Sequence, residues 1–299
     1  MFDFSGNNKH ILKDTNLQYQ LQENGFVIIP FYTKEDIEHL KVFYNNITPN
    51  DTKGFQPTTY FHDNDYRIKA SNEILKIAVP HIEDHLENYK IFMGSFIVKY
   101  ADKNSELGVH QDMTLVDESK FMGINIWSPL CDTNEENGAL YLIPKSHRLF
   151  PTYRAATIPN VYDKYVELVK KYMQPVYLKA GEAILFDNSI MHFSPINKSN
   201  EVRIATNVFI THNEAVITIC YNDKEKNKIE LFEQEDDFFT SYKQFDNQSN
   251  MLRPRIGKSI GFTDYNFPVL TPAILEAKYG KIKNEGWIQK IKNKLFSTL

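Results

Sequence analysis

The sequence predicts a mainly β fold, a sandwich or a barrel, with helices in its N-terminal and C-terminal parts. After residue 90, short runs of β-branched and aromatic residues follow one another closely, and each is typical of a strand. Turn-forming pairs such as Asn137-Gly138 and Ala180-Gly181 separate several of them. Many short strands at close spacing favour a β-sandwich or a barrel.

Residues 1–90 form an N-terminal flank that we expect to be largely helical. Within it, the apolar run 25–31 predicts a buried strand. Thr33 and Asp36 then form a capping-box pattern, so a helix is predicted over about 34–47. The apolar residues of 72–89 predict a further helical region in two pieces, because Pro80 interrupts it.

The β core is predicted to extend from about 91 to 220. We expect its strands at about 91–100, 121–128, 139–143, 174–179, 182–187, 190–194, 202–211 and 214–220. One helix, at about 161–173, interrupts the series because its apolar residues recur at helical spacing.

The pattern becomes irregular in the last part of the chain, and we expect an irregular or helical extension over 221–299. Its acidic and aromatic segment, 233–245, is interpreted as a helix or an insertion. A lysine-rich helix is predicted at the end, with four apolar residues on one face: Trp287, Ile288, Ile291 and Leu295. We expect this face to pack on its own domain, and a membrane or a partner surface is the alternative.

Length, charge and cysteine content narrow the class of protein. A chain of 299 residues is near the upper limit of one hydrophobic core, so a single domain over 1–299 is predicted. The net charge of -4 provides no general attraction to nucleic acid or to an anionic membrane. Two cysteines are too few for a disulfide framework. Because neither a signal peptide nor a transmembrane run is apparent, a cytoplasmic location is predicted.

Three residues predict a metal centre: His110, Asp112 and His192. Residues i and i+2 of an extended segment point to the same side, so His110 and Asp112 can converge on one point. A histidine from a later strand then completes a set of two imidazoles and one carboxylate, which suits Fe(II) with open coordination positions. The alternative is a hydrogen-bonded surface pair together with an ordinary core histidine.

Arg203 and Ser194 predict an anion site beside this centre. A strand, a turn and a return strand would bring Arg203 next to His192, and Ser194 lies on the same side of its strand as His192. A guanidinium in an apolar core requires a partner, and a buried carboxylate fits it in bidentate fashion. An arginine in a surface salt bridge at a strand edge is the alternative.

These residues lie within segments that resemble the phytanoyl-CoA dioxygenase family of Fe(II)/2-oxoglutarate oxygenases. The matching segments are GVHQD (108–112), INIWSPL (124–130), ENGALYLIPKSH (136–147), LKAGEAILFDNSIMHFSPIN (178–197) and EVRIATNVF (201–209). The opening NGFVIIPFYTKEDIEHL (24–40) is also similar to the family's usual start. The resemblance implies a double-stranded β-helix, also called a jelly roll, with flanking N-terminal and C-terminal helices.

The resemblance also implies the cofactors. Fe(II) would be bound by His110, Asp112 and His192, with 2-oxoglutarate and O2 as co-substrates. The far carboxylate of 2-oxoglutarate would meet Arg203 and Ser194, and Trp127 would line the pocket. Lys99 would reach the cofactor, and a lysine on a solvated face of its strand is the alternative. Because Asp112 is present, the resemblance favours hydroxylation of an unactivated C–H, with release of succinate and CO2, over halogenation.

The substrate is expected to be a small molecule, acidic or linked to a carrier. Its candidate contacts are Gln111, Arg67 and Arg154, and either arginine could pair with an acidic group. The alternative is that both are ordinary surface arginines. The fold alone does not define the substrate, because one fold supports many reactions.

Two other functions fit the same residues. The first is a cupin-like metal-dependent isomerase or hydrolase, which would use the three ligands without needing Arg203. The second is a non-catalytic binding module that has kept the fold. The sequence does not define the oligomeric state.

Overall fold

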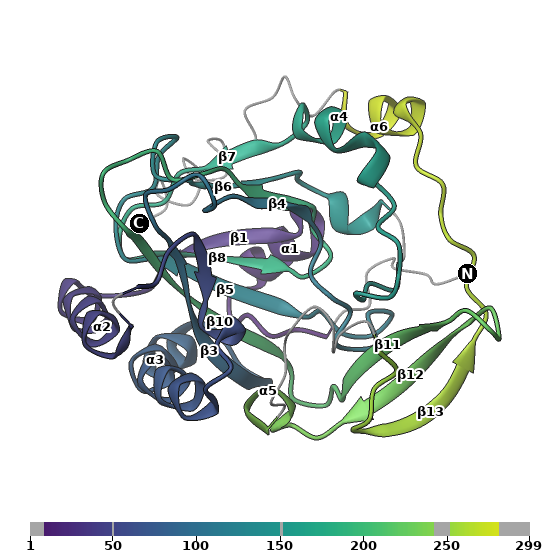
Figure 1. Cartoon of the computed structure of the whole chain (residues 1–299), viewed down its shortest axis with the longest axis horizontal. Helices are drawn as coiled ribbons and strands as arrows, with labels where there is room; N and C mark the ends of the chain where they lie inside the picture. Colours follow the sequence, from purple (N-terminus) through teal and green to yellow (C-terminus); the bar gives the residue numbers. More distant parts are fainter. Residues whose placement is uncertain (1–8, 50, 150–151, 242–251, 281–299) are drawn as a thin grey trace.

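The computed structural model describes residues 9–49, 51–149, 152–241 and 252–280, and a six-stranded antiparallel sheet lies at its centre (Figure 1). The strand order in this sheet is β1-β8-β5-β10-β3-β2. The strands are β1 (Phe26–Pro30), β8 (Glu182–Asp187), β5 (Ile124–Pro129), β10 (Arg203–His212), β3 (Tyr89–Lys99) and β2 (Phe55–Pro57). The N-terminal flank thus contributes two strands to the sheet of the β core.

A four-stranded sheet packs on the inner face of the six-stranded one. Its order is β4-β9-β6-β7, with β4 (Leu107–His110), β9 (His192–Ser194), β6 (Leu140–Leu142) and β7 (Gln174–Val176). Leu142 and Val176 of this sheet belong to one hydrophobic cluster with Phe26, Ile28 and Ile184 of the other. The two sheets therefore form a sandwich, which confirms the predicted jelly roll with flanking helices.

Three helices cover the outer face of the six-stranded sheet: α1 (Thr15–Asn24), α2 (Lys34–Ile47) and α3 (Asn64–His85). Side chains alternate between the faces of a strand, and Val27 and Ile29 of β1 accordingly pack with the helices. The capping box of Thr33 and Asp36 is present at the start of α2, as predicted. This layer fixes the sheet whose opposite face lines the site.

The prediction of two helical pieces around Pro80 is wrong, because α3 runs through Pro80 without a break. A proline removes one backbone hydrogen bond from a helix interior. Here Ala78 and Ile82, on either side of it, are fully buried against the core. Burial of the helix face compensates for the missing hydrogen bond.

Part of the region that was expected to be irregular or helical, 221–299, forms strands instead. A third antiparallel sheet, β11-β12-β13, forms from Ile217–Asp223, Lys228–Gln234 and Lys258–Thr263 (Figure 1, lower right). The charged residues of β12 are the reason that the sequence did not predict this strand. One of them, Glu230, is buried and accepts hydrogen bonds from Arg253 Nε at 2.8 Å and from Ser259 Oγ at 2.7 Å.

The remaining elements are short. The predicted helix at 161–173 is a 3-10 turn, Asp163–Tyr165, followed by α4 (Val166–Lys170). Two further 3-10 turns are Thr58–Tyr60 and Ser146–Arg148. Of segment 233–245, the described residues 233–241 contain the end of β12 and α5 (Phe238–Ser241), and 242–245 lie outside the described residues. Helix α6 (Pro272–Tyr279) follows β13.

The predicted apolar face of Trp287, Ile288, Ile291 and Leu295 lies outside the described residues. Among the helices that are described, none is both long enough and apolar enough to cross a membrane. The prediction of a single domain over 1–299 stays a prediction.

Gly94 of β3 packs against Ile74 of α3, and this contact predicts a loss of stability in Gly94→Ala. The added Cβ would lie 2.7 Å from Ile74 Cγ2, in a fully buried position. We expect the free energy of unfolding to fall by about 1–3 kcal/mol, as for other overpacked cores. Denaturant unfolding measures it, with Gly108→Ala as the matched control because a Cβ there meets no atom within 4 Å. Equal stability of the two variants would contradict the described packing.

Candidate metal centre

The pairing of β4 with β9 brings the predicted ligands together. His110 at the end of β4 lies directly opposite His192 at the start of β9, and Asp112 follows just beyond β4. One potential ligand atom of each residue lies within 4.8 Å of the other two. Asp112 Oδ1 is 3.4 Å from His110 Nε2, and Asp112 Oδ2 is 3.9 Å from His192 Nε2. The three side chains thus converge on one point.

Both imidazole rings are held in the orientation that a metal ligand needs. His110 Nδ1 is 2.9 Å from the carbonyl oxygen of Gly108, and His192 Nδ1 is 2.9 Å from that of Ile190. A carbonyl oxygen only accepts, so each Nδ1 carries the hydrogen and each Nε2 presents a lone pair. Such a backbone contact orients the ring in many metal sites.

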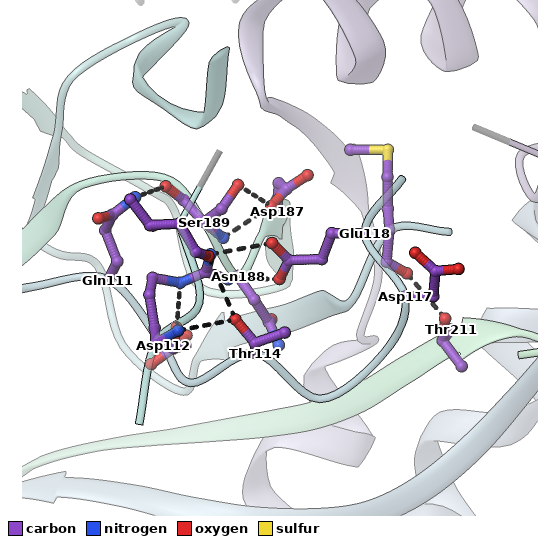
Figure 2. Close-up of polar contacts among 12 residues, drawn as sticks. Gln111, Asp112, Thr114, Asp117, Glu118, Asp187, Asn188, Ser189 and Thr211 are labelled. Carbon is purple, nitrogen blue, oxygen red and sulfur yellow. Dashed lines mark hydrogen bonds and ion pairs between the residues drawn. The ribbon is translucent and has the colours of Figure 1, made fainter. Parts of the chain in front are cut away.

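Asp112 is held from several directions. Its backbone N–H donates to the carbonyl of Asn188 at 2.8 Å, and Asn125 Nδ2 donates to its Oδ2 at 2.8 Å. Figure 2 shows Asp112 and Gln111 against the loop that carries Asn188 and Ser189. The carboxylate therefore has a fixed position before any ion binds.

The protonation states of Asp112 and His192 also suit a cation. Burial alone would raise the pKa of Asp112, but His192, His110 and Arg154 outweigh it and lower this pKa to about 2. Burial, with His110 nearby, lowers the pKa of His192 to about 4. Burial also acts to lower the pKa of His110, but Asp112 outweighs it and raises that pKa. At neutral pH, Asp112 is ionised and His192 is neutral, as metal binding requires.

A cavity of about 400 Å³ adjoins the three residues, and Arg203 lies in its wall. Arg203 is 2% exposed, and Cζ of its guanidinium lies 5.1 Å from the centre of the Trp127 ring. Its Nε has no hydrogen-bond partner, and no described carboxylate forms an ion pair with the guanidinium. Burial lowers the pKa of Arg203 to about 10, so the group remains charged at neutral pH.

Ser194 and Trp127 line the same cavity as Arg203, as the sequence predicted. The hydroxyl of Ser194 donates to the carbonyl of Gly138 at 2.7 Å, which leaves its oxygen lone pairs as acceptors only. A contact between this hydroxyl and a carboxylate would therefore require it to rotate. Trp127 provides the flat surface over which Arg203 lies.

The structure does not support the expected contact of Lys99 with the cofactor. Lys99 pairs with Arg203 across β3 and β10, but its ammonium group turns away and donates to three carbonyl oxygens, of Ser105, Ser194 and Pro195. These bonds use all three of its N–H groups. Its role is to tie β3 to the end of β9.

The two arginines predicted to bind substrate are engaged elsewhere. Arg154 donates from Nε to the carbonyl of Asp112 at 2.6 Å, and its two terminal nitrogens bind the carboxylate of Glu118. Arg67 is buried in α3, where its Nη2 donates to Asn64 Oδ1 at 2.7 Å. Neither lines the metal cavity. Gln111 does line it, with its amide donating to the carbonyl of Ser189.

Two asparagines of the site were not predicted, Asn125 in β5 and Asn207 in β10. Both line the cavity, and Asn207 Nδ2 donates to Asn125 Oδ1 at 2.6 Å. The sequence feature that could have indicated them is an asparagine at an inward position of an otherwise apolar strand. A buried amide requires hydrogen-bond partners, so such an asparagine suggests a polar site. His147, by contrast, has a structural role: its Nε2 contacts the carbonyl of Gln22 at 2.9 Å.

The fold and the convergent His-Asp-His set define the class: a jelly-roll protein with a candidate metal centre. Comparison with known sequences defines the family. The family model described as phytanoyl-CoA dioxygenase (PhyH) matches residues 21–205, well over half of the chain. The chain therefore belongs to this family. The match ends within β10, just beyond Arg203.

Two curated relatives share this similarity. A phytanoyl-CoA dioxygenase domain-containing protein 1 homolog from Dictyostelium discoideum is 32% identical over an alignment of 133 residues, which covers 40% of this chain and 47% of the relative. Phytanoyl-CoA dioxygenase domain-containing protein 1 from Danio rerio is 27% identical over 140 residues, 44% of this chain and 48% of the relative. The chain spans about half the length of the curated relatives it matches.

Solved structures share the fold at low identity. The carbocyclase SnoK from nogalamycin biosynthesis, described as non-heme and alpha ketoglutarate dependent, aligns with a TM-score of 0.51 and 16% identity, covering 68% of this chain and 86% of that chain. HygX from Streptomyces hygroscopicus, with nickel and 2-oxoglutarate bound, aligns with a TM-score of 0.50 and 16% identity, covering 67% and 87%. These likenesses concern the fold.

The contact between Asn125 and Asp112 predicts that Asn125→Leu weakens metal binding. Loss of a residue that orients a ligand typically lowers metal affinity by roughly 10–100-fold. Competition titration of the purified variant with Co(II) or Zn(II) measures this change. The matched control is Asn222→Leu, because Asn222 is a partly buried asparagine in β11 whose amide donates to the carbonyl of Thr157 instead. Equal metal affinity in the two variants would show that Asn125 does not position Asp112.

Proposed function

We propose that this protein is an Fe(II)- and 2-oxoglutarate-dependent dioxygenase that hydroxylates an unactivated C–H of a small molecule. The observation that carries the proposal is the unpaired guanidinium of Arg203 in the wall of the cavity that also holds His110, Asp112 and His192. A buried charge requires a counter-ion. A dicarboxylate that binds the metal at one end supplies that counter-ion at its other end.

The donor set fits iron of this kind. Two neutral imidazole nitrogens and one carboxylate oxygen, on one side of a common point, leave the opposite coordination positions for other ligands. His110, Asp112 and His192 would hold the ion, and Arg203 would hold the far carboxylate of 2-oxoglutarate. When bound, Fe(II) and 2-oxoglutarate supply the oxidation by O2 that yields succinate and CO2.

The residues of this chain position the metal ligands and exclude water from the cavity. The carbonyls of Gly108 and Ile190 hold the two imidazoles, and Asn125 holds Asp112. Buried apolar side chains such as Phe186 and Leu140 line the cavity and keep water out. Because Asp112 occupies the carboxylate position, oxygen transfer is favoured over halogen transfer.

The proposal predicts that Arg203→Met abolishes tight binding of 2-oxoglutarate while metal binding remains. Methionine keeps much of the buried volume but removes the counter-charge, and loss of one partner of a buried ion pair costs about 3–5 kcal/mol, or more than a hundredfold in affinity. Anaerobic calorimetry with the Fe(II)-loaded protein measures it. Arg148→Met is the control, since Arg148 forms a partly exposed ion pair with Glu23. Unchanged 2-oxoglutarate affinity in the variant would show that Arg203 does not bind the far carboxylate. No binding of 2-oxoglutarate by the unmodified protein would favour a cupin-like isomerase or hydrolase.

The metal centre predicts different outcomes for two buried histidines. His192→Ala should lose stoichiometric iron and all succinate release under air. His147→Ala should retain iron, although it loses stability, because its ring contacts the carbonyl of Gln22 and the backbone turn at Gly25. Iron content after anaerobic reconstitution and succinate release with candidate substrates measure both. Full iron content in His192→Ala, or none in the unmodified protein, would favour a non-catalytic binding module.

A further inference from the structure

The cavity is predominantly apolar on the side away from Arg203. Its wall there includes Met93 of β3, Phe209 of β10 and Phe239 of α5, which belong to one hydrophobic cluster. Phe209 and Phe239 lie outside the part of the chain that the family model matches. Among the described residues that line the cavity, Arg203 is the only lysine or arginine. An anionic substrate would therefore find no free cation there.

A polar residue, Asn207, lies beside these apolar residues in the cavity lining. It lies in β10 on the same side as Arg203, four residues further along the strand, so the two are about 13 Å apart at the usual rise of a strand. Its neighbours across the sheet are Trp127 of β5 and Ser95 of β3. Asn207 therefore marks a different end of the cavity from the arginine that would bind 2-oxoglutarate.

The orientation of the Asn207 amide is fixed by the metal ligand. The oxygen and nitrogen of an asparagine amide are assigned from their hydrogen-bond partners. The carboxylate of Asp112 only accepts, so Asn125 must direct its NH2 group to it and present Oδ1 on its other side. Asn125 Oδ1 in turn requires a donor, which is Nδ2 of Asn207 at 2.6 Å. The carbonyl oxygen of Asn207, Oδ1, is therefore the atom of this amide that is left without a partner.

Asn207 lines the cavity, and its Oδ1 is buried without a hydrogen-bond donor. The neighbouring hydroxyl of Ser95 does not serve it, because it donates to the carbonyl of Phe96 at 3.1 Å. Leaving a buried acceptor without a donor is unfavourable. Neither carboxylate nor the keto group of 2-oxoglutarate could satisfy it, because all of them only accept hydrogen bonds. The missing partner is an O–H or N–H group.

We propose that Asn207 is a substrate-binding residue and that the substrate is an uncharged molecule whose hydroxyl or N–H donates to Asn207 Oδ1. The apolar part of that molecule packs on Met93, Phe209 and Phe239. This assignment rests on the proposed function, since 2-oxoglutarate occupies the Arg203 end. It replaces the expectation of an acidic substrate, whose candidate partners Arg67 and Arg154 lie outside the cavity lining.

Three ring compounds of similar size test the assignment: cyclohexanol, which can donate a hydrogen bond, cyclohexanone, which can only accept, and cyclohexanecarboxylate, which is charged. Ligand-observed NMR measures their affinities for the full chain loaded with Zn(II) and 2-oxoglutarate. We expect the alcohol to bind about tenfold more tightly than the ketone, the factor contributed by one net hydrogen bond. We expect the carboxylate to bind most weakly.

Three variants test whether Asn207 causes the preference for the alcohol over the ketone. Asn207→Leu and Asn207→Val remove the acceptor, and the second suits a strand because valine is β-branched. Both should bind the alcohol and the ketone equally, whereas Ser95→Ala, on the strand opposite, should keep the preference. A preference that survives in both Asn207 variants, or tightest binding of the carboxylate by the unmodified protein, would overturn the assignment.

The 2-oxoglutarate signal in the same samples serves as an internal control. Each variant should still bind 2-oxoglutarate, which shows that it has folded with an intact metal centre. If 2-oxoglutarate fails to bind the unmodified protein, the proposed function fails. If it binds but the ring compounds show no dependence on Asn207, only the assignment of Asn207 fails.

Discussion

A positive charge buried in an apolar interior is unstable without a counter-ion, and Arg203 is such a charge. Its position is dictated by the register of β10 between β3 and β5, which also directs Asn207 toward the same cavity. The sandwich leaves this space open between its two sheets. A ligand with a carboxylate at one end and metal-binding oxygens at the other satisfies both the arginine and the three convergent ligands.

The arrangement around Asp112 links the metal centre to the substrate side of the cavity. Two amides, Asn125 and Asn207, form a chain of hydrogen bonds that begins at the carboxylate. Each bond fixes the direction of the next, so an ionised metal ligand determines which atom of Asn207 is left without a partner. Arg154 and Glu118 support Asp112 from the backbone side.

Much of the sandwich and its metal centre could be predicted from the sequence because both depend on local spacing. The i, i+2 relation of His110 and Asp112 and the turn between His192 and Arg203 are encoded in short segments. The contacts of Lys99 and Arg154 could not be predicted from local spacing: Lys99 donates to the carbonyls of Ser105 and Pro195, and Arg154 binds Glu118.

The third sheet, β11-β12-β13, was not predicted, for a related reason. A glutamate such as Glu230 is not expected in a buried strand unless it has a partner. Its partner, Arg253, is known only from the structure. Likewise, the continuity of α3 across Pro80 depends on burial against the core, which periodicity alone does not reveal. Contacts between residues far apart in the chain thus account for most of what the sequence left open.

The most direct measurement is a crystal structure of the full chain grown anaerobically with Fe(II) and 2-oxoglutarate. Our account predicts one ion bound by His110 Nε2, His192 Nε2 and a carboxylate oxygen of Asp112, with the far carboxylate of 2-oxoglutarate paired to the guanidinium of Arg203. A structure in which Arg203 pairs with a carboxylate of the protein itself, or in which 2-oxoglutarate is bound away from the ion, would contradict it.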